Sequence, residues 1–136
     1  MKTTRTSIQG RFGDFDVFNH VNNVSQQQYL DIGRIDFILK HICSDMFARS
    51  VRVILVSVNM DFVDQLTMGH PIEVVTELER VGNKSISLRQ RIVKRVDDEE
   101  VVCTTSTSVL VAWDVAEQKA VPVPDEWRQR LESPEE

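Results

Sequence analysis

The sequence has little cysteine, little proline and no excess of positive charge. Its two cysteines, Cys43 and Cys103, lie far apart and form no CxxC pair, so neither a disulfide framework nor a zinc site is expected. Three of its four prolines lie near the C-terminus, which leaves the middle of the chain free for regular structure. The net charge of −5 argues against a nucleic-acid partner, because phosphate binding needs a basic face.

Long apolar segments are also missing. Residues 1–12 carry charges but lack the apolar core of a signal peptide. No run approaches the roughly 18 apolar residues that span a bilayer. We therefore expect a cytoplasmic protein without a membrane partner. A chain of 136 residues fits a single domain, residues 1–136, that is large enough to bury a core.

The hydrophobic pattern predicts one short strand, one long helix and then four long strands. Residues 4–12 predict the first strand, residues 13–23 a loop, and residues 23–41 a helix with apolar side chains on most of its surface. The period then changes to two, and apolar residues alternate from Ile54 to Phe62. A short polar helix is expected at residues 125–131. Strands joined by short turns pair antiparallel, so the pattern predicts an α+β fold in which an antiparallel sheet is wrapped around one long central helix.

The loop before the long helix concentrates the residues that could perform chemistry. It carries Asp14, Asp16, His20 and three asparagines within ten residues. A helix N-terminus offers unpaired N–H groups that bind anions, including the oxyanion of an acyl transfer. A carboxylate nearby could act on the same carbonyl as a base or a nucleophile. The same residues could instead only cap the helix and shape the turn. Neither a calcium loop nor a zinc site fits them, so no metal is expected.

This loop carries a specific resemblance. The stretch GDFDVFNHVNN, followed by YLDIGR, resembles the hotdog-fold thioesterases of the 4-hydroxybenzoyl-CoA thioesterase type, whose pattern is roughly D-x-D-x-x-G-H-V-N-N and then Y-x-x-Y-x-E-x-x-R. It is also similar to the D-x-D-V-N-x-H-V-N-N-V segment of plant acyl-carrier-protein thioesterases. The resemblance implies a hotdog fold and hydrolysis of an acyl-CoA thioester, with no cofactor besides the coenzyme A of the substrate. It further implies a homodimer or homotetramer with sites at the subunit interface.

The resemblance also assigns roles to four residues. Asp16 matches the catalytic aspartate of the family, and it would activate a water molecule or attack the carbonyl itself. His20 matches the histidine of the HVNN element, and it would orient the reactants or hold the loop. The N–H groups of Asn23 or Val24 would bind the carbonyl oxygen of the thioester.

Three further residues are possible supporting residues. Asn19 stands where the family has glycine, and since asparagine tolerates left-handed backbone angles, the turn is expected to survive. Asp31 and Arg34 lie three residues apart on one helical face, where a structural ion pair explains them as well as a catalytic role does. Gln26 replaces the usual first tyrosine of the helix, which leaves the lining of the acyl pocket open. Asp14 is expected to be structural.

Two other functions stay open at this stage. The substrate could be an acyl-acyl-carrier protein, or the chain could be a non-catalytic hotdog domain that binds an acyl ligand. Hydrolysis of carrier-protein esters alone would favour the first, and ligand retention without turnover the second. Arg89, Arg91 and Arg95 lie at even spacings, and they predict either a basic patch for coenzyme A phosphates or a solvated strand face.

Overall fold

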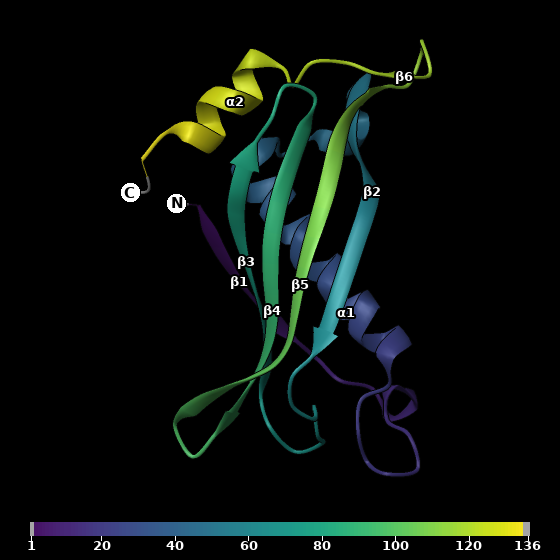
Figure 1. Cartoon of the computed structure of the whole chain (residues 1–136), viewed down its shortest axis with the longest axis vertical. Helices are drawn as coiled ribbons and strands as arrows, with labels where there is room; N and C mark the ends of the chain where they lie inside the picture. Colours follow the sequence, from purple (N-terminus) through teal and green to yellow (C-terminus); the bar gives the residue numbers. More distant parts are fainter. Residues whose placement is uncertain (1, 135–136) are drawn as a thin grey trace.

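The computed structural model describes residues 2–134, and in it a curled antiparallel sheet lies over one long helix (Figure 1). This is the α+β hotdog arrangement that the sequence predicted. None of the helices in the described part combines the length and the apolar character that crossing a bilayer requires. The strands are β1 (Thr3–Ile8), β2 (Val51–Phe62), β3 (Ile72–Val81), β4 (Ser85–Val96), β5 (Glu99–Asp114) and β6 (Lys119–Ala120); the helices are α1 (Asn23–Phe37), continued by a π-helical turn (Ile38–Ile42), and α2 (Asp125–Glu132).

The strand order places the loop between β2 and β3 beside the start of α1. The order is β1-β3-β4-β5-β2, with β6 paired to β5. β2 and β3 are consecutive in the chain but do not pair, so residues 63–71 must cross the lower end of the sheet (Figure 1). On the way, the carbonyl of Leu66 accepts a hydrogen bond of 2.7 Å from the N–H of Val21. This contact fixes the loop that precedes α1 against the sheet.

The sequence predicted the helix starts correctly and one strand end incorrectly. Helix α1 begins at Asn23 and α2 at Asp125, as predicted. The first strand ends at Ile8 instead of continuing to residue 12. The reason is a 3-10 turn over Phe12–Asp14, in which the N–H of Asp14 donates to the carbonyl of Arg11. The turn directs the chain away from the sheet and toward the helix.

The predicted alternation along β2 is broken by a β-bulge between Leu55 and Ser57. Ile54 pairs with Val111 and Val58 pairs with Ser108, so Ile54 and Val58 lie on opposite faces of the sheet. β2 is also an edge strand, and most of its side chains are exposed. The alternating pattern therefore does not correspond to a buried face.

The sheet face that contacts α1 is hydrophobic at both ends and polar in the middle. Along β4, Leu88 belongs to one buried cluster, Ile92 to another, and Gln90 lies buried between them. Gln90 Nε2 donates to the carbonyl of Leu30 at 2.9 Å and to Thr76 Oγ1 at 3.0 Å, and Oε1 accepts from Arg34 Nη1 at 3.1 Å. This polar middle part of the face, the polar band, continues on β5 with the buried residues Thr104, Ser106 and Ser108.

Helix α1 approaches β3 closely at Gly33. A Cβ atom at this position would lie 2.5 Å from Cγ1 of Val74, which is closer than packed carbon atoms tolerate. We expect Gly33→Ala to lower the free energy of unfolding by about 1–3 kcal/mol through overpacking, measured by urea denaturation. Gly13→Ala is the control, because a Cβ there would meet no atom within 4 Å. Equal unfolding free energies for the two variants would contradict the prediction.

Candidate active site

The loop before α1 forms a tight turn around Asp16. Asp16 Oδ1 accepts hydrogen bonds from the N–H groups of Phe18 at 2.9 Å and His20 at 3.2 Å. The main chain closes the same turn, since Asp16 N donates to the carbonyl of His20 at 2.9 Å. Asn19 has a φ of 66°, which confirms that it supplies the left-handed conformation expected of a glycine. Asp16 is exposed, and no group of residues 2–134 donates to its Oδ2.

The start of α1 leaves two backbone N–H groups free. Asn22 caps the helix: its Oδ1 accepts from Ser25 N at 2.8 Å and its carbonyl from Gln26 N at 3.1 Å. The N–H groups of Asn23 and Val24 have no acceptor among the described residues. Free N–H groups at a helix N-terminus bind anions. Asn23 and Val24, for which the sequence predicted contact with the thioester carbonyl, thus carry unpaired donors in the described structure.

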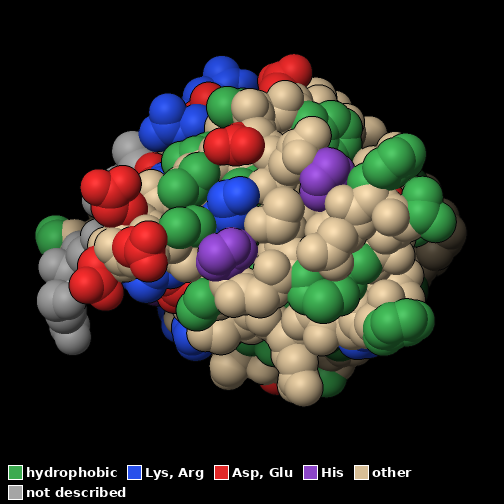
Figure 2. Space-filling model, turned by 90° about the horizontal axis from the view of Figure 1, so that it is seen from below, with side chains coloured by type: hydrophobic (Ala, Val, Ile, Leu, Met, Phe, Trp, Pro, Cys, Tyr) green, Lys and Arg blue, Asp and Glu red, His purple; other side chains and the backbone are tan. Residues whose placement is uncertain are grey.

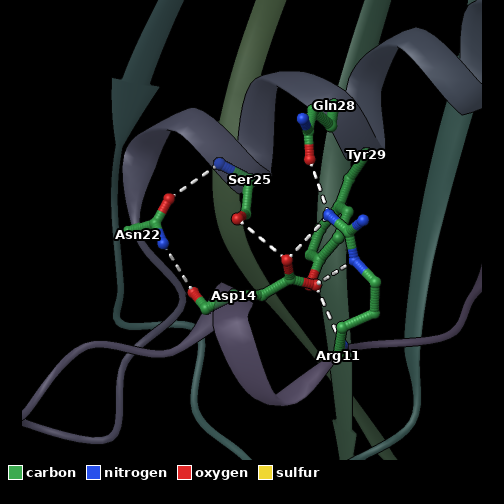
Figure 3. A network of polar contacts seen from close by, with 6 residues as sticks. All are labelled: Arg11, Asp14, Asn22, Ser25, Gln28 and Tyr29. Carbon is green, nitrogen blue, oxygen red and sulfur yellow. Dashed lines mark hydrogen bonds and ion pairs between the residues drawn. The ribbon is translucent and has the colours of Figure 1, made fainter.

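Behind this turn, Asp14 lies buried in a network of polar contacts (Figure 3). Its carboxylate accepts hydrogen bonds from Tyr29 Oη at 2.6 Å, Ser25 Oγ at 3.0 Å and Arg11 N at 2.9 Å. Arg11 Nη2 also forms an ion pair with it at 2.9 Å and donates to Gln28 Oε1 at 2.7 Å. Asp14 is thus structural, as predicted, and connects the segment that follows β1 to the first turns of α1.

These contacts change the protonation of both partners. Burial alone would raise the pKa of Asp14, but the hydrogen bonds from Tyr29, Arg11 and Ser25 outweigh it and hold that pKa well below the usual carboxyl range. Burial and the hydrogen bond to the Asp14 carboxylate raise the pKa of the Tyr29 hydroxyl above its ordinary value. Asp14 is therefore an anion and Tyr29 a neutral donor across the physiological pH range.

A cavity of about 660 Å³ lies beside α1, between this helix and the edge strand β2. Its volume is in the range of pockets for small organic ligands. Val24, Asp31 and Arg34 line it, whereas Asp16, His20 and Asn23 do not. Its other lining residues come from the segment after β1, from α1 and from β2: Gln9, Arg11, Gln27, Gln28, Tyr29, Leu30, Ile32, Leu55 and Val58.

Arg34 and Asp31 form a weak ion pair at the cavity wall. Arg34 is 5% exposed and is held by Gln90 of the sheet, while Asp31 Oδ1 lies 3.5 Å from Arg34 Nη2. Burial lowers the pKa of Arg34, and the charge of Asp31 opposes this shift. The contacts of Arg34 are therefore those of a side chain that joins the helix to the sheet.

Of the three consecutive glutamines, only Gln27 and Gln28 face the cavity. Gln26 is buried against the sheet, where its Nε2 donates to the carbonyl of Val21 at 3.2 Å and its Oε1 accepts from the hydroxyl of Thr104. The residue that replaces the family tyrosine thus bonds to β5 and leaves the cavity lining to its neighbours.

The end of the molecule that carries the loop exposes several large apolar side chains (Figure 2). Phe12 is 92% exposed and Val17 93%, with Phe18 at 75%. His20 is half-buried and forms a β-bridge with Thr67, and its imidazole makes no hydrogen bond within the described part of the chain. The backbone of His20 therefore shapes the turn around Asp16.

Sequence reasoning missed the contacts between residues far apart in the chain. Asp14 stands in the D-x-D pattern and Tyr29 at the second tyrosine of the Y-x-x-Y pattern. The spacing of these patterns did not predict the hydrogen bond that joins the two residues across 15 positions. The predicted arginine patch is partly neutralised, because Glu77 lies 2.6 Å from Arg91 and 3.9 Å from Arg89. The register of β3 against β4 places Glu77 directly opposite Arg89, and Arg91 lies two residues further along β4.

Comparison with known proteins finds thioesterases among the relatives of this chain and among the structures that resemble it. The long-chain acyl-CoA thioesterase FadM of Escherichia coli (strain K12) is 26% identical over 132 residues, which cover 94% of this chain and 96% of that protein. A predicted thioesterase from Bacillus stearothermophilus has a similar structure, with a TM-score of 0.84, 27% identity and coverage of 96% of this chain and 94% of that one. The structure of a 4-hydroxybenzoyl-CoA thioesterase variant in complex with 4-hydroxybenzoyl-CoA shares the fold at a TM-score of 0.84 and 16% identity, covering 96% of this chain and 99% of that one. The family described as the thioesterase-like superfamily matches residues 11–131, and the chain belongs to this family.

Proposed function

We propose that Asp16 and the free N–H groups of α1 hydrolyse the thioester of an acyl-coenzyme A. The observation that carries the proposal is the pair of free N–H groups of Asn23 and Val24, which follows directly on the loop of Asp16. Val24 also lines the cavity, so the start of the helix opens onto a space that could hold an acyl group. A thioester carbonyl whose oxygen bonds to these N–H groups would place its acyl chain along α1.

The reaction needs only groups that this chain provides. The N–H groups of Asn23 and Val24 stabilise the oxyanion that forms when the carbonyl carbon is attacked. Asp16 Oδ2 either takes the proton of an attacking water molecule or attacks the carbon itself, after which water cleaves the acyl-aspartyl anhydride. In both routes the C–S bond breaks, and coenzyme A leaves as a thiolate that takes up a proton. A single turnover in ¹⁸O-labelled water tests the second route: attack of water on the aspartyl carbon of the anhydride puts label into the Asp16 carboxylate, which the first route never does, whereas attack on the acyl carbon puts the label into the product acid in both routes.

Coenzyme A enters this reaction as part of the substrate, and we propose that the chain needs no other cofactor and no metal. The relative FadM, which is named a long-chain acyl-CoA thioesterase, supports the choice of coenzyme A as the carrier. The cytoplasmic location stays a prediction, to be checked by cell fractionation.

The experiment that tests the function is a hydrolysis screen with detection of the free thiol. The panel contains acyl-CoA esters of several chain lengths, aryl-CoA esters and the same acyl groups on acyl-carrier protein. Release of coenzyme A supports the proposal. Turnover of carrier-protein esters alone would show that the substrate is an acyl-acyl-carrier protein. Tight retention of acyl-CoA without thiol release would show that the protein binds an acyl ligand without hydrolysing it.

We also propose that the protein is a homodimer joined through β2. In the described part of the chain β2 pairs with β5 alone, so its other edge has free backbone groups. Leu55, Val58 and Phe62 are exposed on this strand, and Leu55 and Val58 form one wall of the cavity. An exposed apolar edge strand invites pairing with another strand. A second copy of β2 would extend the sheet and close the cavity from the β2 side.

The double substitution Leu55→Lys with Val58→Lys tests this interface. Lysines on an edge strand prevent pairing between chains, so we expect the molar mass in sedimentation or light scattering to fall to that of one chain. Phe47→Lys with Val115→Lys is the matched control, because both side chains are exposed and apolar but lie outside β2, so the dimer should stay intact. An unchanged mass for the double variant would contradict pairing through β2.

A further inference from the structure

Asp14 has no part in the reaction proposed above, yet its carboxylate lies at the centre of the network in Figure 3. The side chain bonds to residues before the loop and after it, namely Arg11 on one side and Ser25 and Tyr29 of α1 on the other. A buried carboxylate is stable only when its charge is compensated and its oxygens are bonded. Here every compensating group comes from an element that borders the Asp16 loop.

The main chain of Asp14 closes the same loop at its base. Its carbonyl oxygen accepts hydrogen bonds from the N–H of Asn22 at 2.8 Å and from Asn22 Nδ2 at 3.0 Å. Residues 15–21 therefore begin directly after Asp14 and end directly before its partner Asn22, and Phe15 pairs with Val21 just inside. The loop is closed at Asp14, and the Asp14 side chain attaches this closed loop to α1.

We infer that Asp14 is a positioning residue, which holds the loop of Asp16 and the free N–H groups of Asn23 and Val24 in one fixed arrangement. The inference rests on the proposed function, since it takes Asp16 and these N–H groups as the reacting set. Asp14 itself touches no reacting atom. The network also holds Arg11 and Gln28, which line the cavity, so the same carboxylate shapes the wall beside the helix.

The first test is Asp14→Asn, which keeps the size of the side chain but replaces one acceptor oxygen by an NH₂ group facing the donors Tyr29 and Arg11. A displacement of about 1 Å in a reacting set costs roughly 100-fold in rate, so we expect kcat to fall by about that factor while KM changes little. Asp36→Asn is the matched control, because Asp36 lies on the same helix and accepts from Thr6 Oγ1 at 2.7 Å. A kcat for Asp14→Asn equal to that of the control would overturn the inference.

The second test is the milder variant Tyr29→Phe, which tests the same positioning role if Asp14→Asn does not fold. The titratable groups that contact the Asp14 carboxylate are Arg11 and Tyr29. Removal of the Tyr29 hydroxyl takes away one hydrogen bond that keeps the pKa of Asp14 low, so that pKa rises toward its ordinary value. The lost hydrogen bond also weakens the attachment of the loop to α1, so kcat should fall while KM changes little. A folded Tyr29→Phe protein with the kcat of the parent would overturn the inference.

A third measurement does not depend on activity. Hydrogen exchange at the amides of Phe18 and His20, which donate to Asp16 Oδ1, reports how firmly the turn is held. We expect exchange at both amides to be faster in Asp14→Asn than in the parent and unchanged in Asp36→Asn. A parent that hydrolyses no thioester would refute the proposed function. Unchanged exchange in Asp14→Asn would refute the positioning role, whatever the parent hydrolyses.

Discussion

Asp16→Asn is expected to lower kcat for acyl-CoA hydrolysis by roughly 10²- to 10⁴-fold, the usual contribution of a positioned acid–base group. The substitution is conservative for the fold, because the Oδ1 of asparagine can still accept from the N–H groups of Phe18 and His20. What it removes is the negative charge and the basic oxygen of Oδ2. The measurement is the initial rate of thiol release on the best substrate of the screen.

The control for this variant is Asp64→Asn. Asp64 lies in the loop that crosses the same end of the sheet, and its Oδ1 accepts from the N–H of Gln65 at 2.7 Å, so it is also an aspartate in a local turn. Asp64→Asn should hydrolyse at the parent rate, and thermal denaturation should show that both variants are folded. A folded Asp16→Asn protein with parent activity on the whole panel would remove Asp16 from the mechanism.

The fold could be predicted from the sequence where the pattern was local. The succession of long strands with a period of two and the start of α1 at Asn23 both depend on residues close together in the chain. The bulge after Leu55 and the position of β2 at the sheet edge depend on which strand pairs with which. A one-residue irregularity reverses the faces of a strand, so the alternation from Ile54 to Phe62 could not report burial.

The sequence indicated which residues of the candidate site could react, but it did not indicate which residues hold them in place. The D-x-D and HVNN elements located Asp16 and the helix start, because the loop and the helix are adjacent in sequence. The polar residues that hold the Asp16 loop and the start of α1 could be identified only from the structure. Gln90 illustrates the reason, because its bonds to Leu30 and Arg34 cross about 60 positions of the chain.

The substitution with the largest expected effect on stability is therefore Gln90→Leu. It removes the acceptor of Arg34 Nη1 and the donor to the Leu30 carbonyl and to Thr76 Oγ1. Leucine is similar in size, so packing changes little, but a buried guanidinium and a buried hydroxyl each lose a partner. A hydrogen bond to a charged group contributes about 1.5–3 kcal/mol, and an unpaired buried polar group costs about 1–3 kcal/mol. We expect the free energy of unfolding to fall by roughly 3–5 kcal/mol in urea denaturation.

A second substitution shows whether the unpaired charge is the cause. Replacing a buried polar set by apolar side chains of similar volume is often neutral, whereas removing one partner alone is costly. Gln90→Leu combined with Arg34→Met should therefore be more stable than Gln90→Leu alone, because no guanidinium is left buried without its acceptor. Arg34→Met alone leaves Gln90 bonded to Leu30 and Thr76 and should cost less than Gln90→Leu. If the double variant is no more stable than Gln90→Leu, the polar band under α1 acts through packing, and the charge of Arg34 is compensated elsewhere.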